Sequence, residues 1–569
     1  MDILSVVLLI ALVVGLSIPL GRYCANVFMG RRSFFDWLAP LERWFFRIAG
    51  IDTTQDMDWK QSLKALLTIN LVWFVWATVV LCTQGWNPIL NPDHIPSMLP
   101  DQAFNTAISF MTNTNLQHYS GETGASYFSQ LLVFTFLQFV SAGTGIAAMV
   151  ALFRALSVKS AGKLGNFYVD MVKACTRILL PLSVVVAIIL LLSGTPMTFT
   201  GASTVITPQG DTVHVAHGPV AAMVSIKQLG TNGGGFFGPN SAHPFENPTY
   251  LTNAIEFVCI ILISMAMVWA FGHFVGNRKL ALMIFGVMFV GYAILLVPTL
   301  ISEKTGNPSL AHLGIDQSQG SMEGKEVRIG AAQSALWSIT TTCTSNGSVN
   351  AMHDSFTPIS GMFIMLGMQL NAFFGGVGVG FINMFVFVIM AVFIAGLMVG
   401  RTPEFLGKKI EAKEVKIAVI IALMHPLLIL AGTALSSHVW TTTAHPAKTL
   451  GWLLNPGYHG FSEMLYEFTS ASANNGSGFE GLGDSPSVFW NISCGIVMLL
   501  GRFIPIIGPI AIGGAFASKR TVPESAGTLH AHSFTFGVVL LTVIAILGAL
   551  LFFPALALGP IAESLSSLK

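Results

Sequence analysis

Long apolar runs alternate with short polar stretches along the whole chain. A helix of about 20 apolar residues crosses the roughly 30 Å hydrocarbon core of a bilayer. Strands of a transmembrane barrel would instead alternate apolar and polar residues over about ten positions. The predicted fold class is therefore all-α integral membrane, with ten transmembrane helices. The spans are expected at residues 3–21, 63–83, 128–150, 177–194, 252–273, 281–300, 363–398, 416–436, 488–512 and 533–555.

Four shorter segments, at 101–111, 219–229, 331–342 and 461–470, are too brief to cross a membrane. Each follows a predicted span and leads into a polar loop, after which the next span begins. Irregular backbone at membrane depth is tolerated only where protein buries it or water reaches it. The pattern predicts four half-helices that enter the membrane and return as polar loops.

This organisation predicts four pseudo-fourfold helix–pore-loop–helix repeats with one extra helix at each end. The 36-residue span at 363–398 is expected to be broken at 371–380, because four glycines in six residues make a poor continuous helix. The predicted units are 1–62 (a span and a cytoplasmic interfacial segment), 63–150, 177–273, 281–398 and 416–512 (pore repeats 1 to 4), and 530–569 (the C-terminal span).

The four polar loops resemble one another and carry no charge in their cores. One such loop alone would be interpreted as an ordinary turn, since Asn and Gly are common turn residues. Four in matched surroundings predict a K⁺ selectivity filter, in which backbone and side-chain oxygens replace the hydration shell. The candidate filter residues are Thr112, Asn113, Thr114, Asn115, Leu116 and Gln117; Gly230, Thr231, Asn232, Gly233 and Gly234; Thr344, Ser345, Asn346 and Gly347; and Ser472, Ala473, Asn474, Asn475 and Gly476.

Aligning the loops on glycine predicts which positions share a layer. Gln117 then pairs with Gly233, Gly347 and Gly476, and Leu116 pairs with three asparagines. Glycine suits such a layer because it permits backbone dihedrals that other residues avoid and leaves room near an axis. The alignment makes Gln117 the one departure from a four-glycine layer.

Composition and charge agree with a membrane protein and set its orientation. The chain is 53% hydrophobic and 10% charged, whereas soluble proteins have about 25% charged residues. The loops on one side of the predicted spans hold 21 Lys and Arg, and those on the other side hold 6. By the positive-inside rule, both termini and all four polar loops are expected outside the cytoplasm.

Charged residues near the loops are the next candidates. Glu122, Glu246, Asp354 and Glu480 each follow a loop within 13 positions, and they are expected to form a negative outer mouth that concentrates cations. The alternative is that they are ordinary solvated or hydrogen-bonded loop carboxylates. Arg502 lies within a span, where it either snorkels to the interface or contacts the ion path or a partner.

The histidines and cysteines are weaker candidates for functional residues. His118, His243 and His353 lie near the loops without metal-ligand spacing and are interpreted as packing residues. Cys175, Cys259 and Cys494 are interpreted as small buried hydrophobes.

At these loops the chain resembles the A-subunit family of the bacterial Kdp potassium-transporting ATPases, in the potassium-transporter superfamily. The resemblance covers essentially the whole chain. Its motifs are residues 112–122 (TNTNLQHYSGE), 230–237 (GTNGGGFF), 350–354 (NAMHD) and 400–404 (GRTPE).

The resemblance implies a K⁺-binding and K⁺-selecting subunit of an ATP-driven uptake pump in the bacterial inner membrane. Partners would be an ATP-hydrolysing B subunit, small C and F subunits, and the lipid bilayer, with no nucleic acid. This chain would bind K⁺ and no nucleotide, and would have no catalytic residue. The family reading also makes Gly375, Gly376, Gly378 and Gly380 an intramembrane gating loop, with ions leaving laterally towards the B subunit.

Two alternatives remain open from the residues alone. One is a K⁺ channel, or a K⁺ transporter coupled to an ion gradient, that acts without partners. The other is an integral membrane enzyme, which would need convergent acid, base or nucleophilic residues that the loop cores do not offer.

Overall fold

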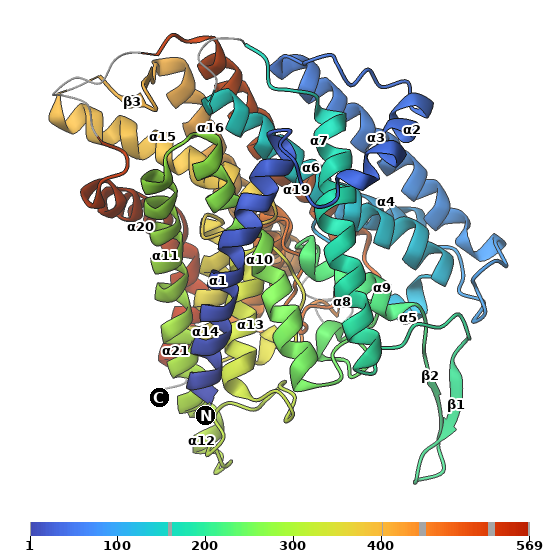
Figure 1. Cartoon of the computed structure of the whole chain (residues 1–569). Helices are drawn as coiled ribbons and strands as arrows, with labels where there is room; N and C mark the ends of the chain where they lie inside the picture. The colour runs from blue at the N-terminus through green and yellow to red at the C-terminus, as the bar shows by residue number, and fades with distance from the viewer. Residues whose placement is uncertain (1, 158–161, 401, 443–450, 522–529, 567–569) are drawn as a thin grey trace.

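A computed structural model describes residues 2–157, 162–400, 402–442, 451–521 and 530–566. Arg401 of the fourth motif and residues 567–569 of the predicted C-terminal unit lie outside this range. The described chain is mainly helical (Figure 1). Its strands form two short antiparallel pairs, β1 (Ser203–Ile206) with β2 (Thr212–Val215) and β3 (Glu404–Phe405) with β4 (Lys408–Lys409).

The prediction of ten membrane-spanning helices is confirmed within the described residues. Five of these spans run on into, or out of, shorter turns or helices. The spans are α1 (Asp2–Phe28); α3 (Trp59–Thr83) with η2 (Gln84–Trp86); η3 (Ser129–Thr135) with α6 (Phe136–Ser157); α7 (Phe167–Ala174) with η4 (Cys175–Leu179) and α8 (Leu180–Leu192); α10 (Tyr250–Phe274); α11 (Arg278–Thr305) followed by α12 (Pro308–His312); α15 (Val379–Val399); α16 (Ala412–Thr442); α19 (Val488–Ser518); and α20 (Phe534–Leu556) with η7 (Ala557–Ile561) and α21 (Ala562–Ser566).

The four short apolar segments are helices, here called the pore helices, and they are largely buried. They are α4 (Pro100–Met111), α9 (Val220–Leu229), α13 (Ala331–Cys343) and α18 (Tyr458–Ala473). The remaining short elements are η1 (Asp36–Leu38), α2 (Ala39–Ile48), α5 (Gly121–Gly124), η5 (Asn240–Ala242), η6 (His353–Ser355) and α14 (Pro358–Leu370).

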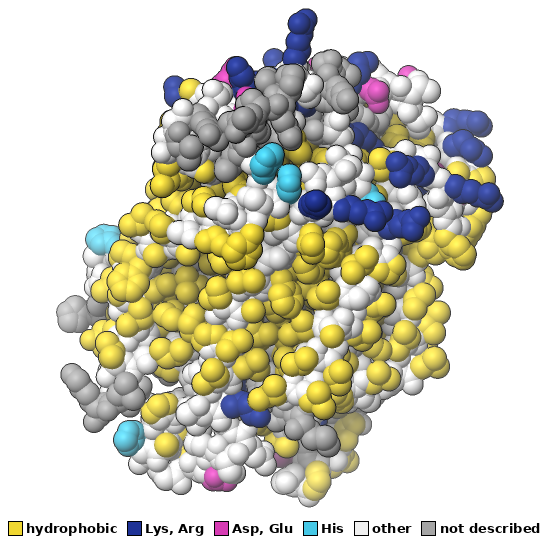
Figure 2. Space-filling view, turned by 60° about the vertical axis from the view of Figure 1, so that its left-hand side comes forward, with side chains coloured by type: hydrophobic (Ala, Val, Ile, Leu, Met, Phe, Trp, Pro, Cys, Tyr) yellow, Lys and Arg dark blue, Asp and Glu magenta, His cyan; other side chains and the backbone are white. Residues whose placement is uncertain are grey.

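The surface follows the division expected for a membrane protein. Figure 2 shows an apolar belt around the middle of one face, with most of the visible Lys and Arg gathered at one end. Leu71 and Val75 of α3 and Val185 and Ile188 of α8 are among the large apolar side chains left exposed. Such surface is unfavourable in water but matches lipid tails. Both termini lie at the other end of the molecule (Figure 1).

The predicted span at 363–398 is two helices rather than one. α14 ends at Leu370, the chain turns at Asn371 with a φ of 43°, and α15 begins at Val379. Phe374, Gly375 and Gly378 also have positive φ angles. The glycine-rich interruption therefore lies where the sequence predicts it.

Ion pairs attach the segment after the first span to the helix bundle. Arg177 of η4 donates to Glu42 of α2 at 2.5 Å and to Asp36 at 2.6 Å. Trp44, Phe45 and Ile48 on the same helix are exposed. An amphipathic helix with this arrangement is typical of an interfacial element.

Candidate functional site

Each candidate filter loop begins where a pore helix ends. Loop 1 (112–117) follows α4, loop 2 (230–234) follows α9, loop 3 (344–347) follows α13 and loop 4 (472–476) includes the last turn of α18. Most of the loop residues are buried, as is most of each preceding helix, whereas Gln117 and Gly476 are partly exposed. Non-helical backbone inside the bundle requires partners for its polar groups.

The backbone of the four loops repeats one conformation. A positive φ recurs at two positions separated by one residue in every loop: at Asn113 and Asn115, Thr231 and Gly233, Ser345 and Gly347, and Asn474 and Gly476. The residue between each pair donates its N–H to a carbonyl five residues earlier in its pore helix, at 2.9 Å in all four loops. The four loops are therefore conformationally equivalent, residue by residue.

This equivalence corrects the alignment predicted from glycine. The residue of loop 1 that matches Gly233, Gly347 and Gly476 is Asn115, and the prediction of Gln117 is wrong by two positions. Asparagine tolerates the left-handed region better than most residues, so it replaces glycine there. One loop does depart from the four-glycine layer, as predicted, but the departing residue is Asn115 and not Gln117.

The loops form a closed ring by touching in sequence. A Cβ on Gly233 would overlap the carbonyl oxygen of Asn346, one on Gly347 that of Asn475, and one on Gly476 that of Thr114. Loops 1 and 2 complete the ring through the Asn113 amide, which donates to the Thr231 carbonyl at 2.8 Å. Four loops that close on one another must surround a common axis.

Asparagine side chains fix each loop to its neighbour. Asn346 donates to the carbonyl of Lys227 in α9 at 3.2 Å, and Asn475 donates to the carbonyl of Thr341 in α13 at 2.8 Å. These bonds satisfy carbonyls at the ends of pore helices, which have no partner within the helix.

A cavity of about 670 Å³ opens above the ring and is lined by residues of loops 1, 3 and 4 and by Gly235, the residue that follows loop 2. Asn115 contributes to it, and both polar atoms of its side chain lack a hydrogen-bond partner within the described chain. The other lining residues include Gln117, Gly235, Gly347, Gly476, Glu480 and Asp484. A polar cavity of this kind gives hydrated ions access to the ring.

The four acidic residues predicted at the mouth have different surroundings. Glu480 lines the cavity and Glu122 is partly exposed, where it accepts the N–H of Gly238 at 2.8 Å. Asp354 is 7% exposed and contacts His459 at 2.9 Å. Burial alone would lower the pKa of His459, but its hydrogen bonds to Asp354 and Glu563 raise that pKa to about 10, so Asp354 faces a cation.

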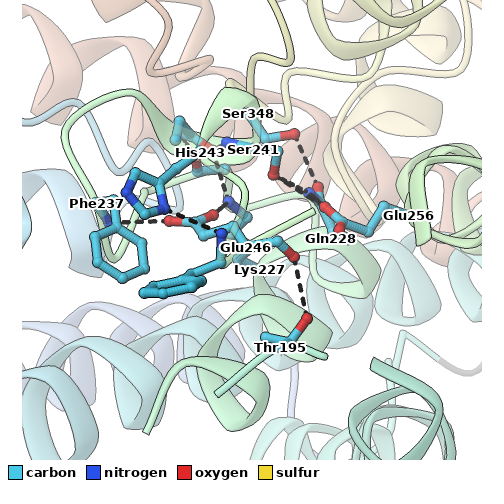
Figure 3. A network of polar contacts seen from close by, with 12 residues as sticks. Thr195, Lys227, Gln228, Phe237, Ser241, His243, Glu246, Glu256 and Ser348 are labelled. Atoms are coloured by element: carbon cyan, nitrogen blue, oxygen red, sulfur yellow. Dashed lines mark hydrogen bonds and ion pairs between the residues drawn. The ribbon is translucent and has the colours of Figure 1, made fainter. Parts of the chain in front are cut away.

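Glu246 does not lie at the mouth. Its side chain is fully buried and paired with Lys227 of α9, which is also fully buried (Figure 3). Lys227 further donates to the Asn240 side-chain oxygen at 2.6 Å, and the Asn240 amide donates to the Gly233 carbonyl at 2.6 Å. The ion pair thus holds the carbonyl of a candidate filter residue in a fixed direction.

The same network reaches loop 3. Gln228 donates to Glu256 at 2.8 Å and accepts from Ser348, just beyond loop 3, at 2.9 Å (Figure 3). Lys227 and Gln228 did not appear among the residues predicted from sequence. The available signal was a single Lys in the otherwise uncharged pore helix 220–229, since a buried cation requires a partner.

The glycine-rich interruption lies against the end of the ring that is remote from the cavity. Gly375 donates its N–H to the Cys343 carbonyl at 3.0 Å, and Val377 donates to the Thr231 hydroxyl at 2.9 Å. Asn371 accepts from Ser345 at 2.9 Å and donates to the Ala473 carbonyl at 3.3 Å. The segment therefore contacts the residues that begin loops 2 and 3 and the Ala473 carbonyl of loop 4.

Arg502 is 4% exposed and donates to the carbonyl of Ser141 in α6 at 3.3 Å. A Cβ added to Gly145 would lie 3.2 Å from its guanidinium and would also overlap the carbonyl of Val377. Arg502 therefore lies inside the bundle beside the interruption, and the snorkelling interpretation does not fit this position.

A family model and the curated relatives that match this chain both describe a subunit of a potassium-transporting ATPase. The family model described as "Potassium-transporting ATPase A subunit" matches residues 7–565. The chain is 57% identical to a protein of Flavobacterium psychrophilum, 58% to one of Flavobacterium johnsoniae and 48% to one of Geobacillus kaustophilus. These alignments cover 98–99% of both chains, and each relative is named the potassium-binding subunit of a potassium-transporting ATPase.

Among solved structures, the chain is similar to the potassium transporter TrkH from Vibrio parahaemolyticus. The TM-score is 0.50 at 15% identity, and the match covers 88% of this chain and 96% of that one. At this identity the likeness concerns the fold.

The Lys227–Glu246 pair yields a stability prediction. Lys227→Met leaves a buried carboxylate without its cation, and breaking a buried pair in this way costs about 3–5 kcal/mol. Adding Glu246→Gln removes the charge while keeping an acceptor for the Phe237 N–H, which Glu246 binds at 2.9 Å. We expect the double variant to recover most of the Tm lost by the single one. An equal Tm loss in both variants would show that the charge pair does not hold this region.

Proposed function

The chain belongs to the potassium-transporting ATPase A subunit family, and we propose that it binds and selects K⁺ for an ATP-driven uptake pump. The ring of four equivalent, uncharged loops carries this proposal. An alkali cation gives up water only where oxygens replace it, and neutral oxygens do so without holding it permanently. K⁺ is the substrate ion of this site, and the chain contributes no nucleotide site to the proposal.

We propose that K⁺ enters from the outer cavity and passes through the ring to the glycine-rich interruption. Gly375, Gly376, Gly378 and Gly380 would form a gate there, because the segment contacts the inner end of loops 2 and 3 and loop 4. Arg502, beside it, would act as an electrostatic barrier on the ion path. Gating would then require little more than exchanging a few hydrogen bonds.

The pump needs an energy source, and we propose that partner subunits supply it. Ion transport against a gradient would be driven by a separate ATP-hydrolysing B subunit, with small C and F subunits completing the complex. The pore repeats would be 63–150, 177–273, 281–398 and 416–512, flanked by 1–62 and 530–569. Copurification of an ATP-hydrolysing partner separates this proposal from a channel that acts alone.

We place the chain in a bacterial inner membrane with both termini on the outer side. The Lys and Arg gathered at the end opposite the termini support this orientation (Figure 2).

The ring yields a selectivity prediction. Gly233 has a φ of 82° and no room for a Cβ beside Asn346, so Gly233→Asp must displace loop 3 and adds a charge to a neutral filter. We expect weaker K⁺ affinity and admission of other monovalent cations, measured as ATP-dependent uptake by the purified complex in vesicles.

Gly286→Ala is the matched control for this variant. Gly286 lies in the membrane-spanning helix α11 with no atom near the position of an added Cβ, so its ion ranking should equal that of the wild type. An unchanged ranking in Gly233→Asp would exclude Gly233 from the filter.

The mouth yields a salt-dependence prediction. Of the four acidic residues, Glu122 and Glu480 have no cationic partner among the described residues, so we restrict the negative mouth to these two with a smaller part for Asp354. Glu122→Gln with Glu480→Gln should raise the apparent KM for K⁺ more at low than at high ionic strength, because salt screens exposed charge.

Asp211→Asn provides the control, since Asp211 is exposed at the turn between β1 and β2. It should leave the KM for K⁺ unchanged at both ionic strengths. A KM increase of equal size at low and high salt in the double variant would contradict the electrostatic role.

A further inference from the structure

A cluster of metal-ligating side chains lies directly behind loop 1, outside the ring. His118 Nε2 is 3.1 Å from Glu467 Oε1 and 3.9 Å from Asp484 Oδ2, and Cys494 Sγ is 3.7 Å from Glu467 Oε1. His118, Glu467 and Cys494 are buried, whereas the Asp484 side chain is 26% exposed. His118 lies 349 positions before Glu467, while Asp484 and Cys494 follow Glu467 in the loop after α18 and in α19. This separation is why spacing along the chain did not indicate a site.

A hydrogen bond at Nδ1 fixes the orientation of the His118 imidazole. Asn491 Nδ2 donates to Asp101 Oδ2 at 2.8 Å, so its Oδ1 faces His118 Nδ1, also at 2.8 Å. An amide oxygen only accepts, so this network assigns the proton to Nδ1. Nε2 therefore points at Glu467 and Asp484, and a second-shell oxygen on Nδ1 is typical of metal-binding histidines.

Two carboxylates, Glu467 and Asp484, face Nε2, and within the described residues neither is paired with a Lys or Arg. Unless a metal is bound, the cation between them is the imidazolium formed by a proton on Nε2. Glu467 Oε2 is buried and has no hydrogen-bond partner within the described chain. A buried group of acceptors is stable only if a proton or a metal cation lies among them.

The spacing and the ligand types favour a metal of a definite class. Zinc bonds of about 2.0–2.3 Å in a tetrahedron place ligand atoms about 3.3–3.8 Å apart. The three separations above are close to those values, and the side-chain ligand atoms of His118, Glu467 and Cys494 all lie within 4.8 Å of one another. A nitrogen and a sulfur ligand exclude Mg²⁺ and Ca²⁺, which prefer oxygen alone.

We propose that His118, Glu467 and Cys494 bind a transition-metal cation of the Zn²⁺ class, with Asp484 as the fourth ligand. The ion enters from the outer cavity, because Asp484 lines that cavity and also approaches His118. On binding, the metal displaces the proton of the Cys494 thiol and any proton on Nε2.

Metal binding here changes the anchoring of loop 1. His118 directly follows Gln117, while Glu467 belongs to the pore helix α18 and Cys494 to the span α19. A bound metal joins these three elements, so extracellular Zn²⁺ becomes a regulator of K⁺ uptake. This consequence rests on the proposed function, whereas metal binding itself does not.

Cobalt(II) is the probe that tests the site, since it replaces zinc and reports its ligands by absorption. The tag-free native complex is dialysed against Co²⁺. The wild type and the Cys259→Ser variant should each bind one Co²⁺ at this site, and the Cys494→Ser variant should not. Its spectrum should contain a thiolate-to-cobalt charge-transfer band that disappears in Cys494→Ser. Cys259 is a matched control because it is another buried thiol, on α10.

Two further variants keep the test decisive if Cys494→Ser fails to fold. Glu467→Gln should retain the charge-transfer band but weaken Co²⁺ binding at least tenfold. Asn491→Leu should weaken it by about 10- to 100-fold, the usual effect of losing a second-shell partner. The proposal is overturned if wild type shows no band, or if the band and the bound Co²⁺ are the same in wild type and these variants. Either result leaves the K⁺ selectivity assay unaffected, so the two proposals fail separately.

Discussion

Backbone polar groups inside an apolar belt must find partners within the protein, and this constraint shapes the whole molecule. Four loops leave helical geometry where the bundle is buried. They remain stable because each donates backbone N–H groups to its own pore helix and side-chain amides to the next one or its loop. The polar groups that remain free can then face the axis. A filter of this kind therefore serves two purposes: it gives buried backbone polar groups their hydrogen-bond partners, and it provides oxygens for an ion.

The ring is symmetric in backbone and asymmetric in side chains. All four loops share the pair of left-handed residues, but Asn115 stands in loop 1 where the others have glycine. The supports differ too: a buried Lys–Glu pair holds loop 2, while a histidine joins loop 1 to α18. One chain that encodes four loops can adjust each separately, which an assembly of identical subunits cannot do.

The sequence predicted the larger features well, for a physical reason. Span length, the four short helices, the break after Leu370 and the uncharged loop cores all follow from hydropathy and local residue preferences. It failed where side chains from distant segments decide the outcome. Glycine alone misplaced loop 1 by two residues, because asparagine also accepts the left-handed conformation. The burial of Glu246 depends on Lys227, and the surroundings of His118 depend on residues more than 340 positions away.

Locating the bound ion tests the central claim most directly. A density map of the complex in Rb⁺ or Tl⁺, heavier substitutes for K⁺, should place ion density on the axis surrounded by Asn113, Thr231, Ser345 and Asn474 and the positions above them. The density should be lost when Na⁺ replaces these ions. Ion density away from this axis, or equal density in Na⁺, would contradict the account.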